Sequence, residues 1–139
     1  MAVLNAQGMY PSLQRGYRLV DMGEVKQMFD MLYSTMAGIT AGLAAGGQAG
    51  AFPLSSGNNR VDAANAGDGV MAPYPALPGL EFTVSNATAN SIQVYGQGTD
   101  QIAPSNSNTP AVATVGVAQV SASYCIYTCF TTGVWKKQS

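Results

Sequence analysis

Apolar and polar residues alternate in the second half of the chain, which is the pattern of β-strands with one buried face. Leu80, Phe82 and Val84 alternate with polar side chains, and Ile92 and Val94 do the same after the small polar stretch NATAN. Because a short polar turn joins two alternating runs, we predict an antiparallel hairpin at this point.

More strands are expected towards the C-terminus. The turn GQGTD precedes a short strand at residues 101–103, and the polar loop PSNSNTP separates this strand from AVATVGVAQV and SYCIYTCF. The segment TTGVWKK supplies a last strand. Residues 80–139 are therefore predicted to form an antiparallel β domain of five or six strands, as a small sandwich or barrel.

Residues 21–46 have a helical period instead. Asp21 can cap a helix, with Glu24 three residues later as its capping-box partner. Apolar residues then recur at helical spacing: Val25, Met28, Phe29, Leu32, Met36, Ile39 and Leu43. We predict one helix over residues 22–44, ended by Gly46 and Gly47, with its apolar stripe packed in a core or against another subunit.

Two segments have neither the alternation of a strand nor the spacing of a helix. Residues 1–20 contain Gly8, Pro11 and Gly16 and are expected to form an extended N-terminal arm. Residues 47–79 are rich in Gly, Ala and Pro and read as an extended connection, either a linker or an arm ordered against a neighbour. The apolar residues in this connection favour the ordered arm. The expected fold class is thus mainly β with one N-terminal α-helix, plus extended arms.

Charge is scarce in this protein. Charged residues make up 9% of the chain and the formal net charge is -1, whereas hydrophobic residues make up 47%. A surface with so little charge resists association poorly, which suits a subunit covered by partners. No basic cluster is large enough for nucleic-acid binding, so no nucleic-acid partner is expected.

The sequence also argues against a membrane or secretory route. The apolar stretch MLYSTMAGITAGLAAGGQAGAF is interrupted by Gly and polar residues, so we expect a packed helix and a loop there rather than a membrane span. The first residues contain no basic region ahead of an apolar run, so no secretory signal is expected.

Candidate reactive groups are few. The chain contains no histidine, which removes the usual general base and the common nucleophile pairs. Carboxylate pairs such as Asp62 with Asp68 are interpreted as solvated loop charges, and the same applies to Glu81 with Asp100. Cys125 and Cys129 lie about 13 Å apart on one face of a strand, too far to bridge each other, and are expected to be buried free thiols. We predict no enzyme activity, no catalytic residues, no cofactor and no metal site.

The C-terminal half resembles a known type of module. The segments PGLEFTVSNATANSIQVYGQGTDQI, VATVGVAQVSASYCIYTC and TTGVW resemble, in this order, a short β module of structural proteins from tailed-bacteriophage virions. The resemblance covers about residues 78–135, and this chain departs from the simplest pattern by the inserted APSNSNTP and by its two cysteines. The resemblance implies a capsid decoration (cement or auxiliary) protein, or another repetitive virion component, commonly trimeric. A decoration protein would bind the exterior of a capsid that is assembled in the host cytoplasm.

On this hypothesis the partners are the major capsid protein and further copies of the chain, and apolar residues of the two arms make the contacts. The predicted contact residues are Tyr10, Leu13, Tyr17, Leu19, Phe52 and Leu54.

One alternative is a receptor- or carbohydrate-binding β module of a head or tail fibre, which would use the C-terminal aromatic residues. Since Tyr124 and Phe130 share a strand face with Ile126, we expect these side chains to pack in the core instead. A head-tail connector or tail component is a further alternative.

Overall fold

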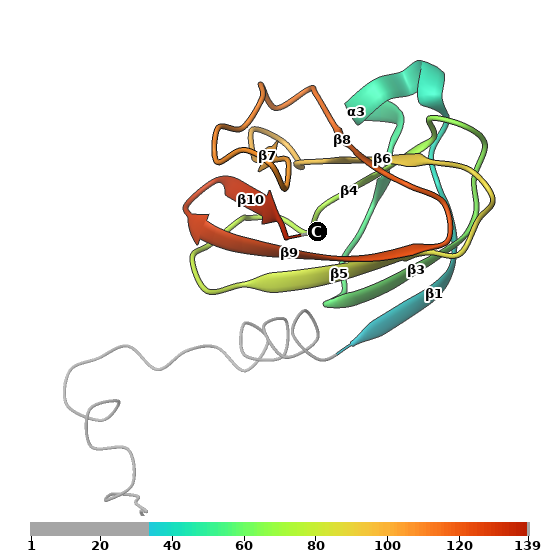
Figure 1. Ribbon diagram of the computed structural model, residues 1–139, viewed down its shortest axis with the longest axis horizontal. Coiled ribbons are helices and arrows are strands. Elements are labelled where there is room, and N and C mark those ends of the chain that lie inside the picture. The colour runs from blue at the N-terminus through green and yellow to red at the C-terminus, as the bar shows by residue number, and fades with distance from the viewer. Residues whose placement is uncertain (1–33, 139) are drawn as a thin grey trace, which may run out of the picture.

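The computed structural model describes residues 34–138, which form ten strands in two sheets (Figure 1). The described chain is 45% strand and 7% helix, which confirms the prediction of a mainly β protein. The larger sheet has the order β1-β3-β5-β9-β10-β7. Its strands are β1 (Thr35–Thr40), β3 (Asn58–Ala63), β5 (Glu81–Asn86), β7 (Gln101–Ala103), β9 (Ser123–Thr131) and β10 (Val134–Lys137).

The smaller sheet has four strands in the order β2-β4-β6-β8. They are β2 (Phe52–Pro53), β4 (Gly69–Met71), β6 (Ile92–Tyr95) and β8 (Val117–Gln119). Between β1 and β2 the chain forms a 3-10 turn, η1 (Ala44–Gly46), and one short helix, α3 (Gly47–Gly50). None of the helical segments between residues 34 and 138 is long and apolar enough to span a bilayer.

Both sheets contribute to one hydrophobic core. In Figure 1 strands β1, β3, β5 and β9 lie below β4, β6 and β8. Phe82 is at the centre, with its ring stacked on Tyr127 and edge-on to Trp135, and each pair of ring centroids is 4.8 Å apart. The smaller sheet adds Val70, Ile92 and Val94 from the opposite side. Burial of these apolar side chains is therefore the main force that holds the two sheets together.

Gln119 of β8 joins the two sheets by hydrogen bonds inside this core. Its side chain is fully buried, and its amide nitrogen donates to the carbonyl oxygens of Val84 (2.8 Å) and Ser123 (3.3 Å). The hydroxyl of Tyr127 donates to the amide oxygen of Gln119 at 2.9 Å. A buried amide with all these partners fixes how β8 sits over β5 and β9.

The predicted helix is wrong from Thr35 onwards, because residues 35–40 form strand β1. Residues 21–33 and the predicted arm over residues 1–20 lie outside the described residues. Gly38 has a positive φ of 73°, which no helix tolerates, and Thr35 and Thr40 are β-branched residues that favour strands. The helical spacing of Met36 and Ile39 also fits two inward positions of an irregular strand, since β1 pairs with β3 through register shifts.

The prediction that residues 47–79 form an extended connection without regular structure is also wrong. This range contains α3, β2, β3 and β4, and β3 lies inside the larger sheet between β1 and β5. Asn59 and Val61 alternate with exposed neighbours in β3, but a buried asparagine does not show in an apolar pattern. Residues 58–63 form a strand because they pair in parallel with β5, and β5 is distant in the sequence.

The predicted hairpin is absent, although both of its strands exist. β5 pairs with β3 and β9, whereas β6 pairs with β4 and β8, so the chain changes sheets between them. Asn86 holds this corner, because its side-chain nitrogen donates to the carbonyl oxygens of Asn90 and Val120 at 2.9 Å each. Its side-chain oxygen accepts hydrogen bonds from the backbone and hydroxyl of Thr88.

The sheets are mixed rather than antiparallel. β1, β3 and β5 run parallel to one another, as do β2, β4 and β6, and β7 runs parallel to β10. The antiparallel pairs are β5 with β9, β9 with β10, and β6 with β8. Repeated crossings between the two sheets place successive strands of one sheet in the same direction, and the local sequence pattern contains no sign of these crossings.

Candidate interaction surface

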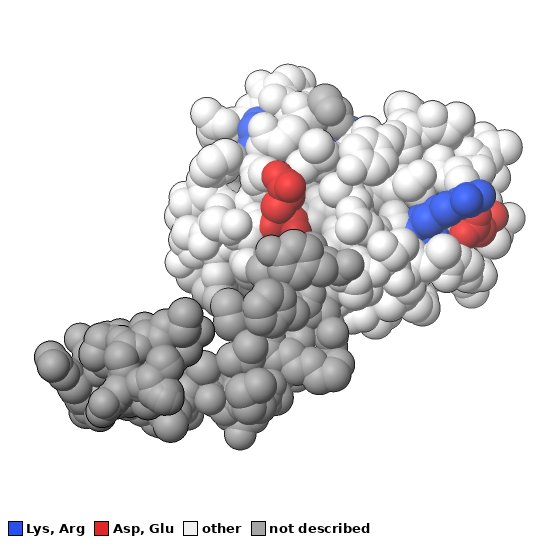
Figure 2. Space-filling view, turned by 90° about the horizontal axis from the view of Figure 1, so that it is seen from below, with Lys and Arg blue, Asp and Glu red and all other residues white. Residues whose placement is uncertain are grey.

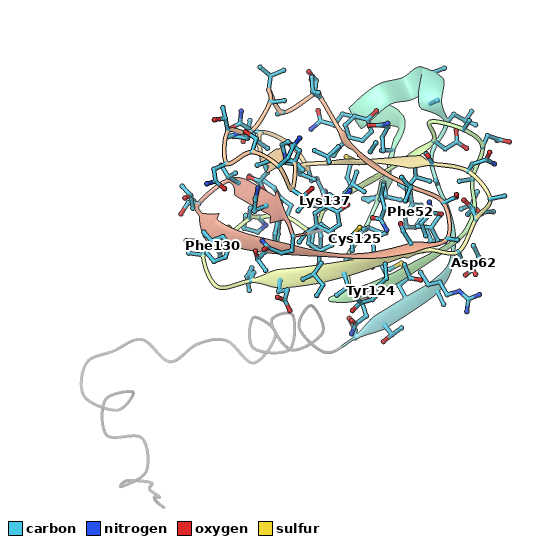
Figure 3. All side chains as sticks on the ribbon, in the orientation of Figure 1. Phe52, Asp62, Tyr124, Cys125, Phe130 and Lys137 are labelled. Atoms are coloured by element: carbon cyan, nitrogen blue, oxygen red, sulfur yellow. The ribbon has the colours of Figure 1, made fainter. Side chains whose placement is uncertain are left out.

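Strand β9 exposes a row of side chains on the side of the larger sheet that faces away from the smaller sheet. Burial alternates along β9, so that Cys125, Tyr127 and Cys129 point into the core. Tyr124 and Phe130 point outward and are 59% and 73% exposed. Figure 3 shows Tyr124 below the sheet and Phe130 near the opposite end of β9. We call this side of the larger sheet the outer face.

The neighbouring strands continue the outer face, because cross-strand partners point to the same side of a sheet. Ile126 pairs with Thr83 of β5, and Thr83 pairs with Asn58 of β3, which in turn pairs with Thr35 of β1. The next row consists of Arg60, Ser85 and Tyr124. The outer face therefore has Tyr124, Ile126, Thr128 and Phe130 along β9, with polar and charged side chains, Arg60 and Glu81 among them, on the neighbouring strands.

An open hollow adjoins the Phe130 end of β9. Its volume is about 240 Å³, and it is lined by Pro78, Gly79, Leu80, Glu81, Thr128, Cys129 and Phe130. Backbone hydrogen bonds from Gly79 to Cys129 and from Cys129 to Leu80 attach this loop to β9. With one carboxylate among mainly apolar groups, the hollow suits an apolar side chain of a protein partner.

Few charges surround this surface. Between residues 34 and 138 the charged side chains are Arg60, Asp62, Asp68, Glu81, Asp100, Lys136 and Lys137. Asp68 and Asp100 are buried, and Arg60 pairs with Asp62 at 2.8 Å. Figure 2 looks at the molecule from the side of the outer face, and most of the described surface in this view is uncharged.

Two of the predicted contact residues, Phe52 and Leu54, lie within the described part of the chain. Leu54 is 2% exposed and belongs to the core, so it has no surface to offer to a neighbour. Phe52 is half-buried in β2 and also packs against the core. Tyr10, Leu13, Tyr17 and Leu19 lie outside the described residues.

The exposed aromatic residues were missed by the sequence interpretation. Tyr124 and Phe130 were expected in the core, but they point outward, while Tyr127 and Trp135 are fully buried. Both faces of β9 carry aromatic residues, so alternation defines two faces without indicating which one is inside. The two cysteines on the same face as Tyr127 were the available signal, because free cysteine is among the most buried residue types.

The cysteine prediction itself is confirmed. Cys125 and Cys129 are free and buried on the inner face of β9. Burial raises the pKa of the Cys129 thiol, which keeps it protonated and unreactive at neutral pH.

A second hollow brings together two carboxylates that lie apart in the sequence. Asp62 and Asp68 both line an open, polar depression of about 550 Å³ at the end of the molecule that holds Asn65, Thr88 and Asn90. The interpretation of Asp68 as a solvated loop charge is wrong, since its carboxylate accepts hydrogen bonds from the backbone N–H groups of Ala44 (2.9 Å) and Asn65 (2.8 Å). Asp62 accepts one from the Gly38 N–H at 2.8 Å. Both groups thus have structural partners, and residues 34–138 contain no group of three or more potential metal ligands.

In the second predicted carboxylate pair only one of the two side chains is buried. Glu81 is exposed on β5, whereas Asp100 is buried, so the interpretation of Asp100 as a solvated charge is also wrong. The Asp100 carboxylate accepts a hydrogen bond from the Ala76 N–H at 2.7 Å. Burial raises the pKa of Asp100, and this hydrogen bond opposes the increase.

Asp68 should make stability depend on acid pH. The two backbone N–H donors lower the pKa of the Asp68 carboxyl in the folded protein. A lowered folded-state pKa stabilises the fold above the pH at which an unfolded aspartate ionises, about 4, and this contribution is lost as the pH falls through the folded-state pKa. We therefore expect Asp68→Asn to lower the thermal unfolding midpoint at pH 7, and the difference from the wild type to shrink below about pH 4.

Thermal unfolding of both proteins, followed by circular dichroism from neutral to acid pH, measures this effect. If the difference between the midpoints stays constant over the whole range, the ionised form of Asp68 has no special role.

No protein-family model matches the chain, and no curated protein or solved structure matches it either.

Proposed function

We propose that this protein is a structural subunit of a tailed-bacteriophage particle, and specifically a homotrimeric decoration protein that binds the exterior of the capsid and stabilises the head. The fold would then serve as a sandwich-like β subunit with an N-terminal arm. The resemblance of residues 78–135 to virion β modules supports this proposal, as does the scarcity of charge in the chain.

The observation that carries the proposal is the character of the described surface. Between residues 34 and 138 eight large apolar side chains are exposed, and they belong to Leu43, Tyr74, Leu77, Val112, Val115, Val120, Tyr124 and Phe130. Such side chains are distributed over loops and the outer face with few charges between them. A subunit in a dense lattice would bury such side chains against its neighbours, and the low charge would oppose that contact little.

The mechanism is mechanical. Each apolar contact with the lattice contributes about 25 cal/mol per Å² of buried apolar area, and many copies act together on one shell. The arm over residues 1–20 would reach an adjacent capsid subunit. Residues 47–79, which the sequence analysis interprets as an ordered arm, contribute strands to the subunit itself.

Quantitative mass spectrometry of purified particles tests the proposal. A copy number close to that of the major capsid protein supports a decoration role over the whole lattice. A few copies per particle would indicate a fibre or connector instead, and absence from the particle would overturn the proposal.

Deletion of residues 1–20 tests the part played by the arm. We expect the deleted protein to keep its sheets, as judged by circular dichroism, and to lose co-sedimentation with capsids. Co-sedimentation equal to that of the full chain would show that the arm does not hold the capsid.

A carbohydrate- or receptor-binding module is the second candidate, and the exposure of Tyr124 and Phe130 favours it because aromatic rings stack on sugars. In that case Tyr124→Ala should reduce the affinity for a glycan without changing the stability of the protein. Tyr127→Ala is the matched control within the same strand, since Tyr127 is buried and its loss should destabilise the fold.

A further inference from the structure

Three segments that are distant in the sequence meet at the turn that joins β6 to β7 (Figure 1). The side-chain nitrogen of Gln48 in α3 donates to the carbonyl oxygens of Gly96 (2.7 Å) and Gly98 (3.1 Å) in this turn. The carboxylate of Asp100, at the end of the turn, accepts a hydrogen bond from the Ala76 N–H at 2.7 Å. The turn is therefore tied both to α3 and to the loop after β4.

Tyr74, in the loop after β4, rests on this turn. Its side chain is 57% exposed, and a Cβ atom on Gly98 would meet three atoms of its ring at 3.4–4.0 Å. Gly98 also has a positive φ of 63°, a backbone conformation that glycine adopts without strain. One side of the Tyr74 ring is thus supported by the turn, while much of the side chain stays open to solvent.

The fold holds this exposed ring in place with a buried carboxylate. Removing the Asp100 carboxylate from water costs free energy, and its hydrogen bond to the Ala76 N–H offsets part of that cost. This hydrogen bond orders a surface loop, the one that contains Tyr74. An aromatic side chain that is fixed before a ligand arrives loses little conformational entropy on binding. The arrangement therefore has the properties of a preorganised binding platform.

The surroundings of the ring are neutral. The loop after β4, the turn and α3 contain no charged residue apart from the buried Asp100. Gln97 and Thr99 flank Gly98 in the turn; the first is half-buried and the second is exposed. A sugar ring has a face of C–H groups that stacks on an aromatic ring, and its hydroxyl groups exchange hydrogen bonds with neutral amides and hydroxyls.

We infer that Tyr74 and the turn over residues 96–100 form a binding platform for a neutral glycan. The Tyr74 ring would stack on a sugar, and the side chains of Gln97 and Thr99 would form hydrogen bonds with its hydroxyl groups. This inference goes beyond the proposed function and does not depend on it.

Two other classes of ligand fit the platform less well. A nucleic acid or an acidic polysaccharide needs cationic side chains, and the three segments contain none. A protein partner is held best where a side chain enters an apolar pocket, and the apolar hollow described above is lined by other residues, at the Phe130 end of β9.

A glycan array tests the inference with the full-length protein. On an array of neutral oligosaccharides the wild type should bind at least one glycan, and isothermal titration calorimetry with that glycan gives the affinity. Tyr74→Ala should weaken the affinity by about tenfold or more, because it removes the stacking ring. Tyr74→Phe keeps the ring and should bind nearly as well as the wild type. Since Tyr74 is exposed, neither variant should change the thermal unfolding midpoint.

Tyr124→Ala is the matched control, because Tyr124 is exposed to a similar degree but lies on the outer face. This variant should leave the affinity for the glycan unchanged. Gln48→Ala separates α3 from the turn without altering the ring. We expect it to weaken the affinity by about threefold or more, because the platform is then less well ordered before binding.

The contrary outcomes are equally definite. If the wild type bound no neutral glycan on the array, or if Tyr74→Ala bound as tightly as the wild type, the inference would be overturned. A loss of affinity in Tyr124→Ala alone would move the glycan site to the outer face. If no glycan bound and Tyr74→Ala instead lost co-sedimentation with capsids, Tyr74 would be a protein contact. The copy number in purified particles tests the proposed function separately.

Discussion

Replacing Trp135 by alanine should lower the free energy of unfolding by about 3–5 kcal/mol, a large part of the total stability of a small domain. Trp135 is fully buried and its ring meets Phe82 edge-on at 4.8 Å, while Phe82 stacks on Tyr127. Removing the indole leaves a cavity on one side of Phe82, where β10 meets the core. Urea unfolding followed by circular dichroism measures the loss.

Trp135→Phe is the matched control for this variant. The indole nitrogen of Trp135 has no hydrogen-bond partner among the described residues, so phenylalanine removes volume without breaking a hydrogen bond. We expect less than half of the loss seen with alanine. If Trp135→Ala were as stable as the wild type, Trp135 would not be a core residue, and a ligand-binding role for it would have to be considered again.

Gln119→Leu should cost at least about 2 kcal/mol, since it leaves the Tyr127 hydroxyl and the Val84 carbonyl without their side-chain partner at about 1–3 kcal/mol each. Leucine has a similar volume, so the loss reports on hydrogen bonds rather than on a cavity. The variant also removes the polar connection between β8 and the larger sheet. Equilibrium unfolding in urea gives the difference from the wild type.

A double-mutant cycle with Tyr127→Phe isolates the connection between the sheets. In the Tyr127→Phe background there is no hydroxyl for Gln119→Leu to leave without a hydrogen-bond partner. The double variant should therefore be more stable than the sum of the two single losses predicts, by about 0.5–3 kcal/mol. Strict additivity would mean that the 2.9 Å contact between these side chains contributes nothing.

Several features of the fold follow from the sequence because they depend on near neighbours in the chain. The alternation of Phe82 and Val84 and of Ile92 and Val94 places strands β5 and β6 correctly and identifies their inward side chains. The absence of histidine and the scarcity of charge restrict the possible chemistry before any coordinates are known. Cys125 and Cys129 are correctly expected to be free and buried.

The candidate surface shows where this reasoning stops. A strand such as β9, with aromatic residues on both faces, has two possible orientations that differ by which face is buried. Only the packing of Tyr127 against Phe82, whose ring also meets Trp135, decides that Tyr124 and Phe130 point outward. The sequence therefore contains the residues of the outer face but not their exposure.

Sequence alone determined a mainly β protein with little charge, free cysteines and most of its C-terminal strands, because alternation and composition are local properties. Tertiary structure decided the rest, namely that residues 35–40 are a strand, that β3 and β4 join the sheets, and that β5 and β6 belong to different sheets. The physical reason is that strand pairing is an interaction between distant segments. A short segment such as β1 becomes a strand when a partner such as β3 satisfies its backbone hydrogen bonds, whatever its own side-chain pattern favours.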